Sequence, residues 1–201
     1  MFFSFDGVDG AGKSTQIHLL ADWLSARGKK VVQCRDPGST ALGEKLREIL
    51  LADRTTPIHR RAEMLLFMAA RAQLVEEIIR PALSTGTFVI SDRFLLANVV
   101  YQALTGELAP AEVWQVGGIA VGGIMPRLTL LLDMPAATAS RRIAREPDRM
   151  ESQGLDYLEQ VRQGFLREAA LRPGEIVVID ASQSVEQVQA QVVRAVEKAL
   201  V

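Results

Sequence analysis

The chain has 201 residues, of which 48% are hydrophobic, and its formal net charge is −1 at pH 7. This length and hydrophobic content suit one substantial α/β core, so we expect a single domain spanning residues 1–201. The nearly balanced charge argues against proteins that coat nucleic acid or bind anionic membranes, because both rely on a surplus of Lys and Arg.

Two further features bear on the compartment and the partners. Cys34 is the only cysteine, so it cannot form an internal disulfide or build a cysteine metal cluster. The apolar run 1–5 begins at the first residue, which leaves no room for a signal peptide, and no apolar run approaches the length of a membrane span. We therefore expect a cytoplasmic enzyme in a reducing compartment, with neither nucleic acid nor a membrane among its partners.

The strongest functional signal follows the first predicted strand, residues 1–5. Residues 7–14 are Gly-Val-Asp-Gly-Ala-Gly-Lys-Ser. A phosphate chain needs backbone N–H groups at close range, and Gly7 and Gly12 provide positions where no side chain blocks that approach. A glycine turn without a ligand is the alternative, but the apolar strand before the loop and the amphipathic helix after it favour a phosphate-binding loop.

The last residues of this loop suit a nucleotide bound with Mg²⁺. Lys13 can reach the β- and γ-phosphates, and the hydroxyl of Ser14 can be a ligand of Mg²⁺. The helix expected after the loop would direct its positive N-terminal end at the bound anion. The residues predicted to bind the phosphates are Gly7, Val8, Asp9, Gly10, Ala11, Gly12, Lys13, Ser14 and Thr15.

Predicted strands and helices alternate through the rest of the chain. This alternation indicates parallel βαβ units with helices on both faces of one sheet. The further strands expected are 31–34, 88–91, 128–132 and 176–179. The further helices expected are 42–51, 57–81, 110–119, 157–171 and 185–200, and another helix carries Asn98 and Tyr101. The sequence therefore predicts an α/β fold with a five-stranded parallel sheet.

Ligands of open α/β sheets bind beyond the carboxyl ends of the strands. The loop 35–40 follows the second strand, and from its residues alone a plain Pro-Gly turn is as good an interpretation as a ligand site. The third strand ends in Asp92, whose carboxylate can hold the Mg²⁺ shell beside the phosphate loop, with Arg93 near the same phosphates. A strand-capping ion pair is the alternative for these two residues. The loop 180–183 lies on the same side of the sheet.

Two groups of residues remain ambiguous from spacing alone. Phe67 and Arg71 are spaced i, i+4 on the long helix and so share one face, yet a core Phe67 and a solvated Arg71 are the better interpretation of that spacing. The stretch 141–151 is too balanced in charge to bind nucleic acid, and Pro147 breaks its helix. The resulting loop can act as an arginine-bearing lid over a phosphoryl group, or it is a solvated charged turn.

Seven stretches in the same order along the chain resemble thymidylate kinases, which are members of the nucleoside monophosphate kinase group. They are 6–15, 35–38 with 42–44, 63–73, 91–94 with 101–102, 128–133, 148–151 and 180–181. The resemblance implies a fold of the P-loop NTPase type. It also implies transfer of the γ-phosphoryl group of ATP to dTMP, giving dTDP and ADP, with Mg²⁺ as cofactor and a homodimeric enzyme.

The resemblance assigns roles that spacing cannot. Phe67 would stack on the thymine ring, Arg71 would hydrogen-bond its exocyclic oxygen, and Asn98 would contact the base. Asp9 would hold the 3′-hydroxyl of the sugar, and Tyr101 would lie under the sugar. The implied dTMP-binding set is Asp9, Arg35, Phe67, Arg71, Arg93, Asn98 and Tyr101, in which Arg93 and Arg35 bind the acceptor's phosphate.

The catalytic arginine is expected from the lid, residues 141–153. Gly10 stands where one branch of the family has an arginine, so this chain resembles the bacterial branch, which supplies that arginine from the lid. The implied catalytic residues are Lys13, Arg93, Arg145 and Arg149, and Ala181, Ser182 and Gln183 would lie near the adenine.

The chain also departs from the family pattern. Asp36 replaces the usual Glu and Ser39 the usual Gly, so the exact ligand contact of the loop 35–40 stays open. Phe94 replaces a common Tyr. Two other functions remain as alternatives: a kinase of the same fold for another small acceptor, and a non-catalytic nucleotide-binding module. A guanine-reading motif is excluded because Asn98 is the only asparagine.

Overall fold

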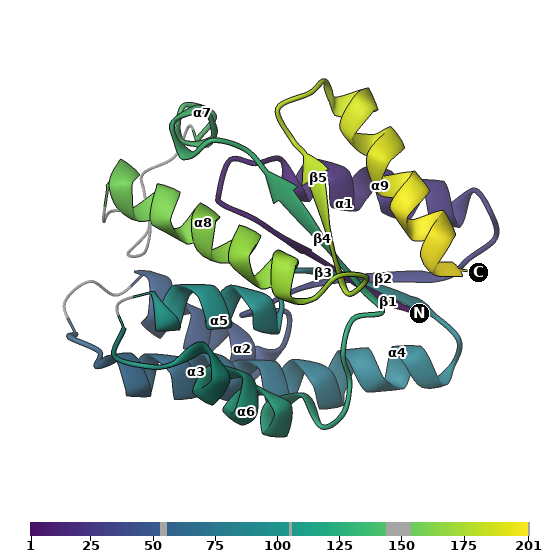
Figure 1. The fold of residues 1–201 in the computed structure, drawn as a ribbon. Coiled ribbons are helices and arrows are strands. Elements are labelled where there is room, and N and C mark those ends of the chain that lie inside the picture. The colour runs from purple at the N-terminus through teal and green to yellow at the C-terminus, as the bar shows by residue number, and fades with distance from the viewer. Residues whose placement is uncertain (53–55, 105, 144–153, 201) are drawn as a thin grey trace.

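The computed structural model describes residues 1–52, 56–104, 106–143 and 154–200. One parallel sheet of five strands lies at its centre, in the order β2-β3-β1-β4-β5 (Figure 1). The strands are β1 Phe2–Asp6, β2 Val31–Arg35, β3 Phe88–Asp92, β4 Leu128–Asp133 and β5 Ile176–Asp180. The predicted five-stranded parallel sheet is therefore confirmed, and each predicted strand lies within one residue of the observed bounds.

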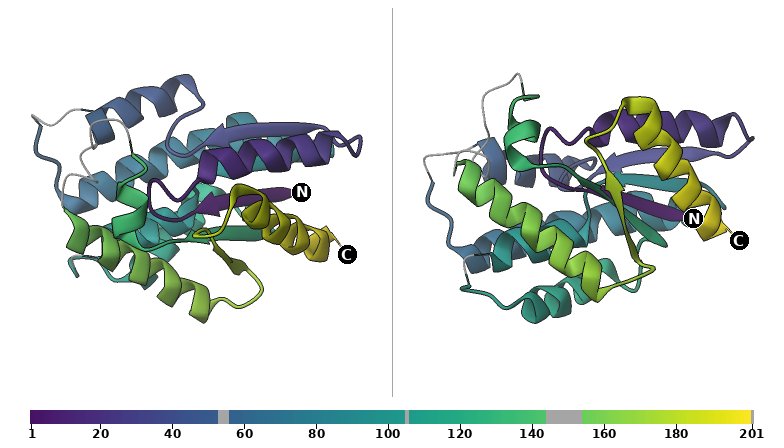
Figure 2. Two further views of the ribbon diagram at one scale, coloured as in Figure 1. Left: turned by 90° about the horizontal axis from the view of Figure 1, so that it is seen from above. Right: turned by 45° about the horizontal axis from the view of Figure 1, so that its top comes forward.

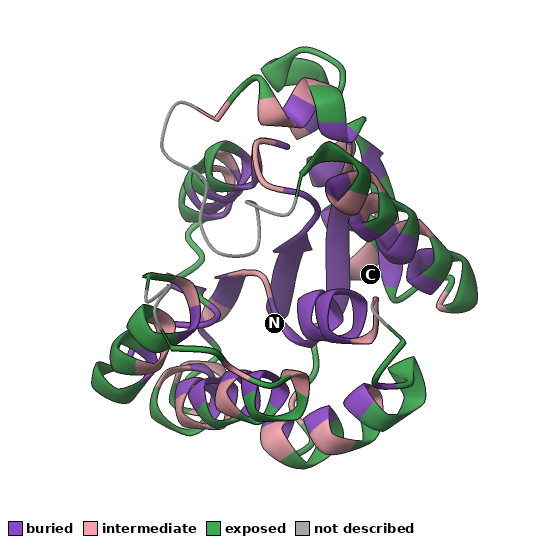
Figure 3. Ribbon diagram, turned by 90° about the vertical axis from the view of Figure 1, so that its left-hand side faces the viewer, coloured by how far each residue is buried: buried purple, intermediate pink, exposed green. Residues whose placement is uncertain are grey.

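The sheet register puts β1 at the centre of the sheet. Phe3 pairs with Ile90 of β3 on one side and with Leu128 of β4 on the other. A central parallel strand is covered by helices on both faces, which explains why β1 is apolar throughout most of its length and fully buried. Figure 3 shows the buried central strands surrounded by helices whose outer faces are exposed.

Helices cover both faces of the sheet. The helices α1 Lys13–Ser25 and α9 Val185–Leu200 lie side by side on one face, as Figure 2 shows. The other face is covered by α5 Leu95–Ala103, α8 Leu155–Leu171 and α4 Arg80–Ser84. Outside this layer, α3 Arg60–Leu74 packs against α2 Ala41–Arg47 and α6 Pro110–Val121. A short helix that the sequence did not predict, α7 Ala136–Ser140, follows β4.

The long helix expected at 57–81 differs from the prediction at both ends. It begins at Arg60, because the residues before it are extended, and it continues past Pro81 to Ser84. Five residues inside it, Val75–Ile79, form a wider π-helical turn. Proline lacks an N–H and its ring clashes with the carbonyl four residues back, so a wider turn just before Pro81 lets the helix continue. A second such turn, Glu48–Ala52, follows α2.

Gly117 is the place where α6 comes closest to α5. A Cβ atom on Gly117 would lie 2.2 Å from Cδ1 of Leu95, so a larger residue would force the side chain of Leu95 to move. Among the helices that the structure describes, none combines the length and the apolar character needed to cross a bilayer.

We expect Gly117→Ala to lower the free energy of unfolding by about 1–3 kcal/mol, because the added methyl group overpacks the contact with Leu95. Gly118 is the matched control, since nothing lies within 4 Å of a Cβ at that position. Alanine is the better helix former, so Gly118→Ala should raise the free energy of unfolding by about 0.5–1 kcal/mol. Urea denaturation measures both, and equal effects of the two substitutions would contradict the close contact.

Candidate active site

The phosphate loop connects β1 to α1 and closes around its own lysine. The Nζ atom of the buried Lys13 donates to the backbone oxygens of Gly7 and Val8, each at 3.1 Å, and to Oδ1 of Asp9 at 3.1 Å. Because every donor of this ammonium group is engaged at the mouth of the loop, Lys13 is held beside the position that a phosphate would occupy. The first residues of the loop thus present their carbonyl groups to Lys13.

Asp9 joins the phosphate loop to the end of β3. Its Oδ1 atom accepts from Lys13 and also from Nη2 of Arg93, at 2.9 Å. Burial alone would raise the pKa of Asp9, but the positive charges of Arg93 and Lys13 outweigh it and hold the pKa well below the usual range. Asp9 is therefore an anion that holds two cations of the site in place.

Arg93 combines an unusual backbone with an unsatisfied donor. Its φ is +65°, a left-handed conformation that residues other than glycine adopt rarely. Its Nη1 atom is buried and has no hydrogen-bond partner among the described residues. Strained backbone and unpaired buried donors gather at functional sites, and an anion beside Arg93 would satisfy this one.

Asp6 lies beneath these cations, at the end of β1. Both carboxylate oxygens are buried and have no hydrogen-bond partner among the described residues. Burial raises the pKa of Asp6 to about 7, although the nearby Arg93 and Lys13 oppose this rise. Near neutral pH a large share of Asp6 is therefore protonated, which reduces the negative charge close to the site of an incoming phosphate.

A pocket of about 300 Å³ opens beside Arg93. Every residue that the resemblance assigned to the acceptor nucleotide lines it, from four separate parts of the chain. The loop 35–40 contributes to the lining through Arg35, Asp36 and Pro37, which favours a ligand site over a plain turn. The residues assigned beforehand are Asp9, Arg35, Phe67, Arg71, Arg93, Asn98 and Tyr101.

Arg71 is not a solvated charge, so the interpretation that its spacing favoured was wrong. It is 1% exposed, and its Nε atom donates to Oδ2 of Asp36 at 2.6 Å. Its Nη2 atom donates to Oδ1 of Asn98 and to the backbone oxygen of Phe94. Phe67, on the same face of α3, is also buried, but it lines the pocket. The i, i+4 spacing correctly predicted that Phe67 and Arg71 share one face of the helix. It could not predict whether that face is buried or exposed to solvent.

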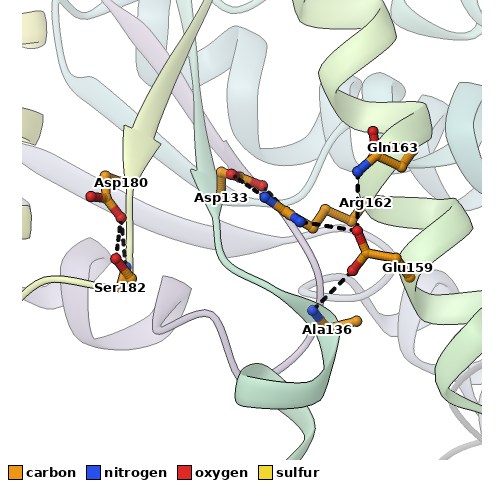
Figure 4. Close-up of polar contacts among 7 residues, drawn as sticks. All are labelled: Asp133, Ala136, Glu159, Arg162, Gln163, Asp180 and Ser182. Carbon is orange, nitrogen blue, oxygen red and sulfur yellow. Dashed lines mark hydrogen bonds and ion pairs between the residues drawn. The ribbon is translucent and has the colours of Figure 1, made fainter.

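A second pocket, of about 500 Å³, lies on the phosphate loop. Its lining contains all of the loop from Asp9 to Thr15, together with Asp92. Ala181 and Gln183 line it from the loop after β5, but Ser182 does not. Instead, the backbone N–H and the hydroxyl of Ser182 both donate to Oδ1 of Asp180 (Figure 4).

A family model described as thymidylate kinase matches residues 5–192. This chain belongs to the thymidylate kinase family. A thymidylate kinase of Rhodopirellula baltica is 51% identical over 194 residues, which cover 96% of this chain and 78% of that protein. One of Thermosipho africanus is 42% identical over 201 residues, covering 100% of this chain and 99% of that protein. The crystal structure of thymidylate kinase from Ehrlichia chaffeensis matches with a TM-score of 0.78 and 27% identity over 98% of each chain.

Membership of this family makes the chain an ATP-dependent dTMP kinase with a fold of the P-loop NTPase type, as the sequence predicted. The non-catalytic nucleotide-binding module is correspondingly disfavoured. Kinases of this kind generally use Mg²⁺, which prefers oxygen ligands and retains several waters or phosphate oxygens. Ser14 and Asp92 fit such an ion, because both are oxygen donors that line both pockets. In the described part of the chain, no cluster of three or more His, Cys, Asp or Glu residues could bind the metal by itself.

Three residues that line these two pockets were not among the site residues predicted from the sequence. Arg47, near the end of α2, lines the acceptor pocket and donates to the backbone oxygen of Pro37 at 3.0 Å. Gln102 also lines that pocket, one helical turn after Asn98, and this i, i+4 spacing could have identified it. Arg142 lines the pocket on the phosphate loop. No spacing signal existed for Arg47 or Arg142, because the fold alone brings them to the site.

The predicted lid arginines Arg145 and Arg149 lie outside the described residues. The chain on either side is described, and Figure 4 shows how α8 holds it. Arg162 of α8 donates to both carboxylate oxygens of Asp133, at 2.7 and 2.9 Å. Glu159 accepts from Arg162 and from the backbone N–H of Ala136, the first residue of α7. The elements before and after the predicted lid are thus both joined to the end of β4.

Proposed function

We propose that the pocket lined by Phe67 and Arg71 binds dTMP and that the pocket on the phosphate loop binds ATP. The observation that carries this proposal is that Asp9, Ser14 and Asp92 line both pockets. Two nucleotides bound there would bring their phosphates together at those residues. The γ-phosphoryl group of ATP then passes directly to the phosphate of dTMP, giving dTDP and ADP.

The chemistry of this transfer is mainly positioning and charge neutralisation. The acceptor phosphate already carries a nucleophilic oxygen, so no general base is needed. Two polyanions must instead approach each other, which requires cations fixed in advance. Lys13 and Arg93 are such cations, because Asp9 orients both of them. Ser14 and Asp92 would hold Mg²⁺ beside the phosphates, where the ion would supply further neutralisation of charge.

On the acceptor side, Phe67 stacks on the thymine ring, Arg71 and Asn98 bind its polar edge, and Tyr101 lies under the sugar. Asp9 accepts a hydrogen bond from the 3′-hydroxyl. The acceptor phosphate is bound by the unpaired Nη1 atom of Arg93, with Arg35 at the pocket's rim. Arg35 is about half exposed and forms an ion pair with Glu44 at 2.7 Å. We therefore expect Arg35 to contribute less than Arg93 to the affinity for the acceptor phosphate.

On the donor side, the loop 7–15 binds the phosphates of ATP, and Ala181 and Gln183 contact the adenine. Arg145 and Arg149 are the proposed catalytic arginines of a lid at 141–153. We treat residues 1–201 as one functional domain that works in the cytoplasm, where a single buried thiol such as Cys34 stays reduced.

Release of ADP from ATP and Mg²⁺ tests these roles when dTMP, dUMP, UMP, dCMP, dGMP, AMP and thymidine are offered separately at equal concentration. Strong preference for dTMP is expected. Turnover with only another acceptor would support the assignment of the phosphate loop but would contradict the base contacts assigned to Phe67 and Arg71. Absence of turnover with all seven acceptors would instead favour the alternative that the protein is a non-catalytic nucleotide-binding module.

We expect Phe67→Ala to weaken dTMP binding by about 5- to 150-fold, because one stacked aromatic side chain contributes about 1–3 kcal/mol. ATP binds in the other pocket, so its affinity should change little. Isothermal titration with each nucleotide measures the two effects. An equal loss for dTMP and ATP would contradict a stacking role.

We also propose that the enzyme is a homodimer. Leu65 on α3 is 54% exposed and Ile119 on α6 is 81% exposed, and these two helices pack against each other. Large exposed apolar side chains on neighbouring helices are suited to a partner of the same kind. Sedimentation equilibrium should give a dimer for the unmodified chain and a monomer for Leu65→Glu with Ile119→Glu. A monomeric unmodified chain would contradict the proposal.

A further inference from the structure

A row of four buried side chains runs along one side of the acceptor pocket and ends behind it. Nη2 of Arg71 donates to Oδ1 of Asn98, Nδ2 of Asn98 donates to Oε1 of Gln102 at 2.7 Å, and Nε2 of Gln102 donates to Oε1 of Glu63 at 3.0 Å. All four side chains are at most 3% exposed. The first three line the pocket, and Glu63 stands behind them on the same helix as Arg71.

The two ends of the row determine the direction of the hydrogen bonds between them. A guanidinium group can only donate and a carboxylate can only accept, whereas an amide can do both and can turn around. Glu63 therefore makes Gln102 direct its NH₂ group away from the pocket and its oxygen toward Asn98. Asn98 in turn gives its NH₂ group to Gln102 and its oxygen to Arg71. A turned amide would place donor against donor at Arg71 or acceptor against acceptor at Glu63.

This direction gives the pocket a fixed order of hydrogen-bonding groups. Four of the five N–H groups of Arg71 donate to Asp36, Met68, Phe94 and Asn98, which leaves one N–H on Nη1 for a ligand. Next to Arg71, the amide oxygens of Asn98 and Gln102 each keep a lone pair that can still accept. A pyrimidine with an oxo group at position 4 carries the matching order, an acceptor beside an N–H donor. A pyrimidine with an amino group at that position carries the reverse order.

We propose that Glu63 is a positioning residue that makes the pocket select 4-oxo over 4-amino pyrimidine nucleotides, acting through Gln102 without touching the substrate. The inference rests on the proposed binding of the base in this pocket. Arg60 donates to the same Oε1 atom of Glu63 at 3.0 Å and so holds the carboxylate from the outer side.

The test is the ratio of kcat/KM for dTMP to that for dCMP in Glu63→Gln. The new side chain has the same size but no charge, and it can donate as well as accept. One end of the row therefore no longer fixes the amide of Gln102, which is then held only by Arg71 acting through Asn98. We expect the ratio to fall by about 10- to 100-fold, the effect of one charge-assisted hydrogen bond, mainly through a higher KM for dTMP. The KM for ATP and the thermal midpoint should change little. Glu76→Gln, the same substitution on the exposed surface of the same long helix, should leave the ratio unchanged.

A second variant separates this role from a general weakening of the pocket. Gln102→Met removes the amide through which Glu63 acts, so Glu63→Gln should add nothing to its loss of selectivity. A ratio within about twofold of the original in Glu63→Gln, or fully additive losses in the double variant, would overturn the proposal.

Arg71→Met distinguishes a failure of this inference from a failure of the pocket assignment. If Arg71→Met keeps the original preference for dTMP, the base does not bind beside Arg71, and both the pocket assignment and the role of Glu63 are wrong. If Arg71→Met loses the preference while Glu63→Gln retains it, the pocket assignment stands and only the role of Glu63 is wrong.

Discussion

Replacing Lys13 with alanine should lower kcat/KM for phosphorylation of dTMP by about 10³-fold or more, with the fold retained. The ammonium group is buried in the lining of the phosphate-loop pocket and pairs with Asp9, which lines both pockets. Preorganised charges in such places contribute factors of about 10² to 10³ or more to phosphoryl and acyl transfer. The substitution also leaves two loop carbonyls without their donor, so ATP affinity should fall as well. Initial rates of ADP release and calorimetric titration with ATP measure the two effects.

Lys45→Ala is the matched control for this experiment, because Lys45 is exposed on α2 and lines neither pocket. Its rate should equal that of the unmodified enzyme, and circular dichroism should give both variants the original spectrum. A Lys13→Ala enzyme with unchanged rates would refute the phosphate-loop assignment.

The second large effect is expected for Arg93→Met, which should lower kcat/KM for dTMP by about 10²- to 10³-fold. The variant loses the unpaired donor assigned to the acceptor phosphate. It also loses a positive charge beside Asp9, so the pKa of that carboxyl should rise toward its usual range. A group whose pKa rises becomes protonated at higher pH, and the residual activity should therefore decline earlier as the pH is lowered.

Thymidine is the control ligand for Arg93→Met, since it has the base and sugar of dTMP but no phosphate. Titration should give equal thymidine affinity in the variant and the original enzyme, while dTMP affinity falls. A comparable loss for both ligands would mean that Arg93 supports the pocket as a whole and does not bind the phosphate.

Features encoded within a few neighbouring residues were predictable from the sequence. The phosphate loop 7–14 and the five strands are of this kind, because glycine spacing and apolar runs determine local backbone structure directly. The continuation of the long helix through Pro81 was not predictable, because a wider turn compensates for the proline and has no residue signature of its own.

The acceptor pocket was predictable only in part. Spacing placed Phe67 and Arg71 on one face, but the burial of Arg71 depends on Asp36 and Asn98, which are distant in the sequence. Family resemblance supplied their candidate roles where local pattern could not. It did not supply Glu63 as part of the same row, because the connection passes through hydrogen bonds between α3 and α5 that only the fold reveals.

The close approach of the phosphate loop to α7 limits how this enzyme can change in evolution. Gly10 has a φ of +84°, and a Cβ atom there would lie 2.1 Å from the backbone oxygen of Ala139. An arginine at position 10, as in the other branch of the family, would require α7 to move before its side chain could be useful. A single substitution at Gly10 would therefore bring its new side chain against α7 before that side chain could contribute to the phosphate loop.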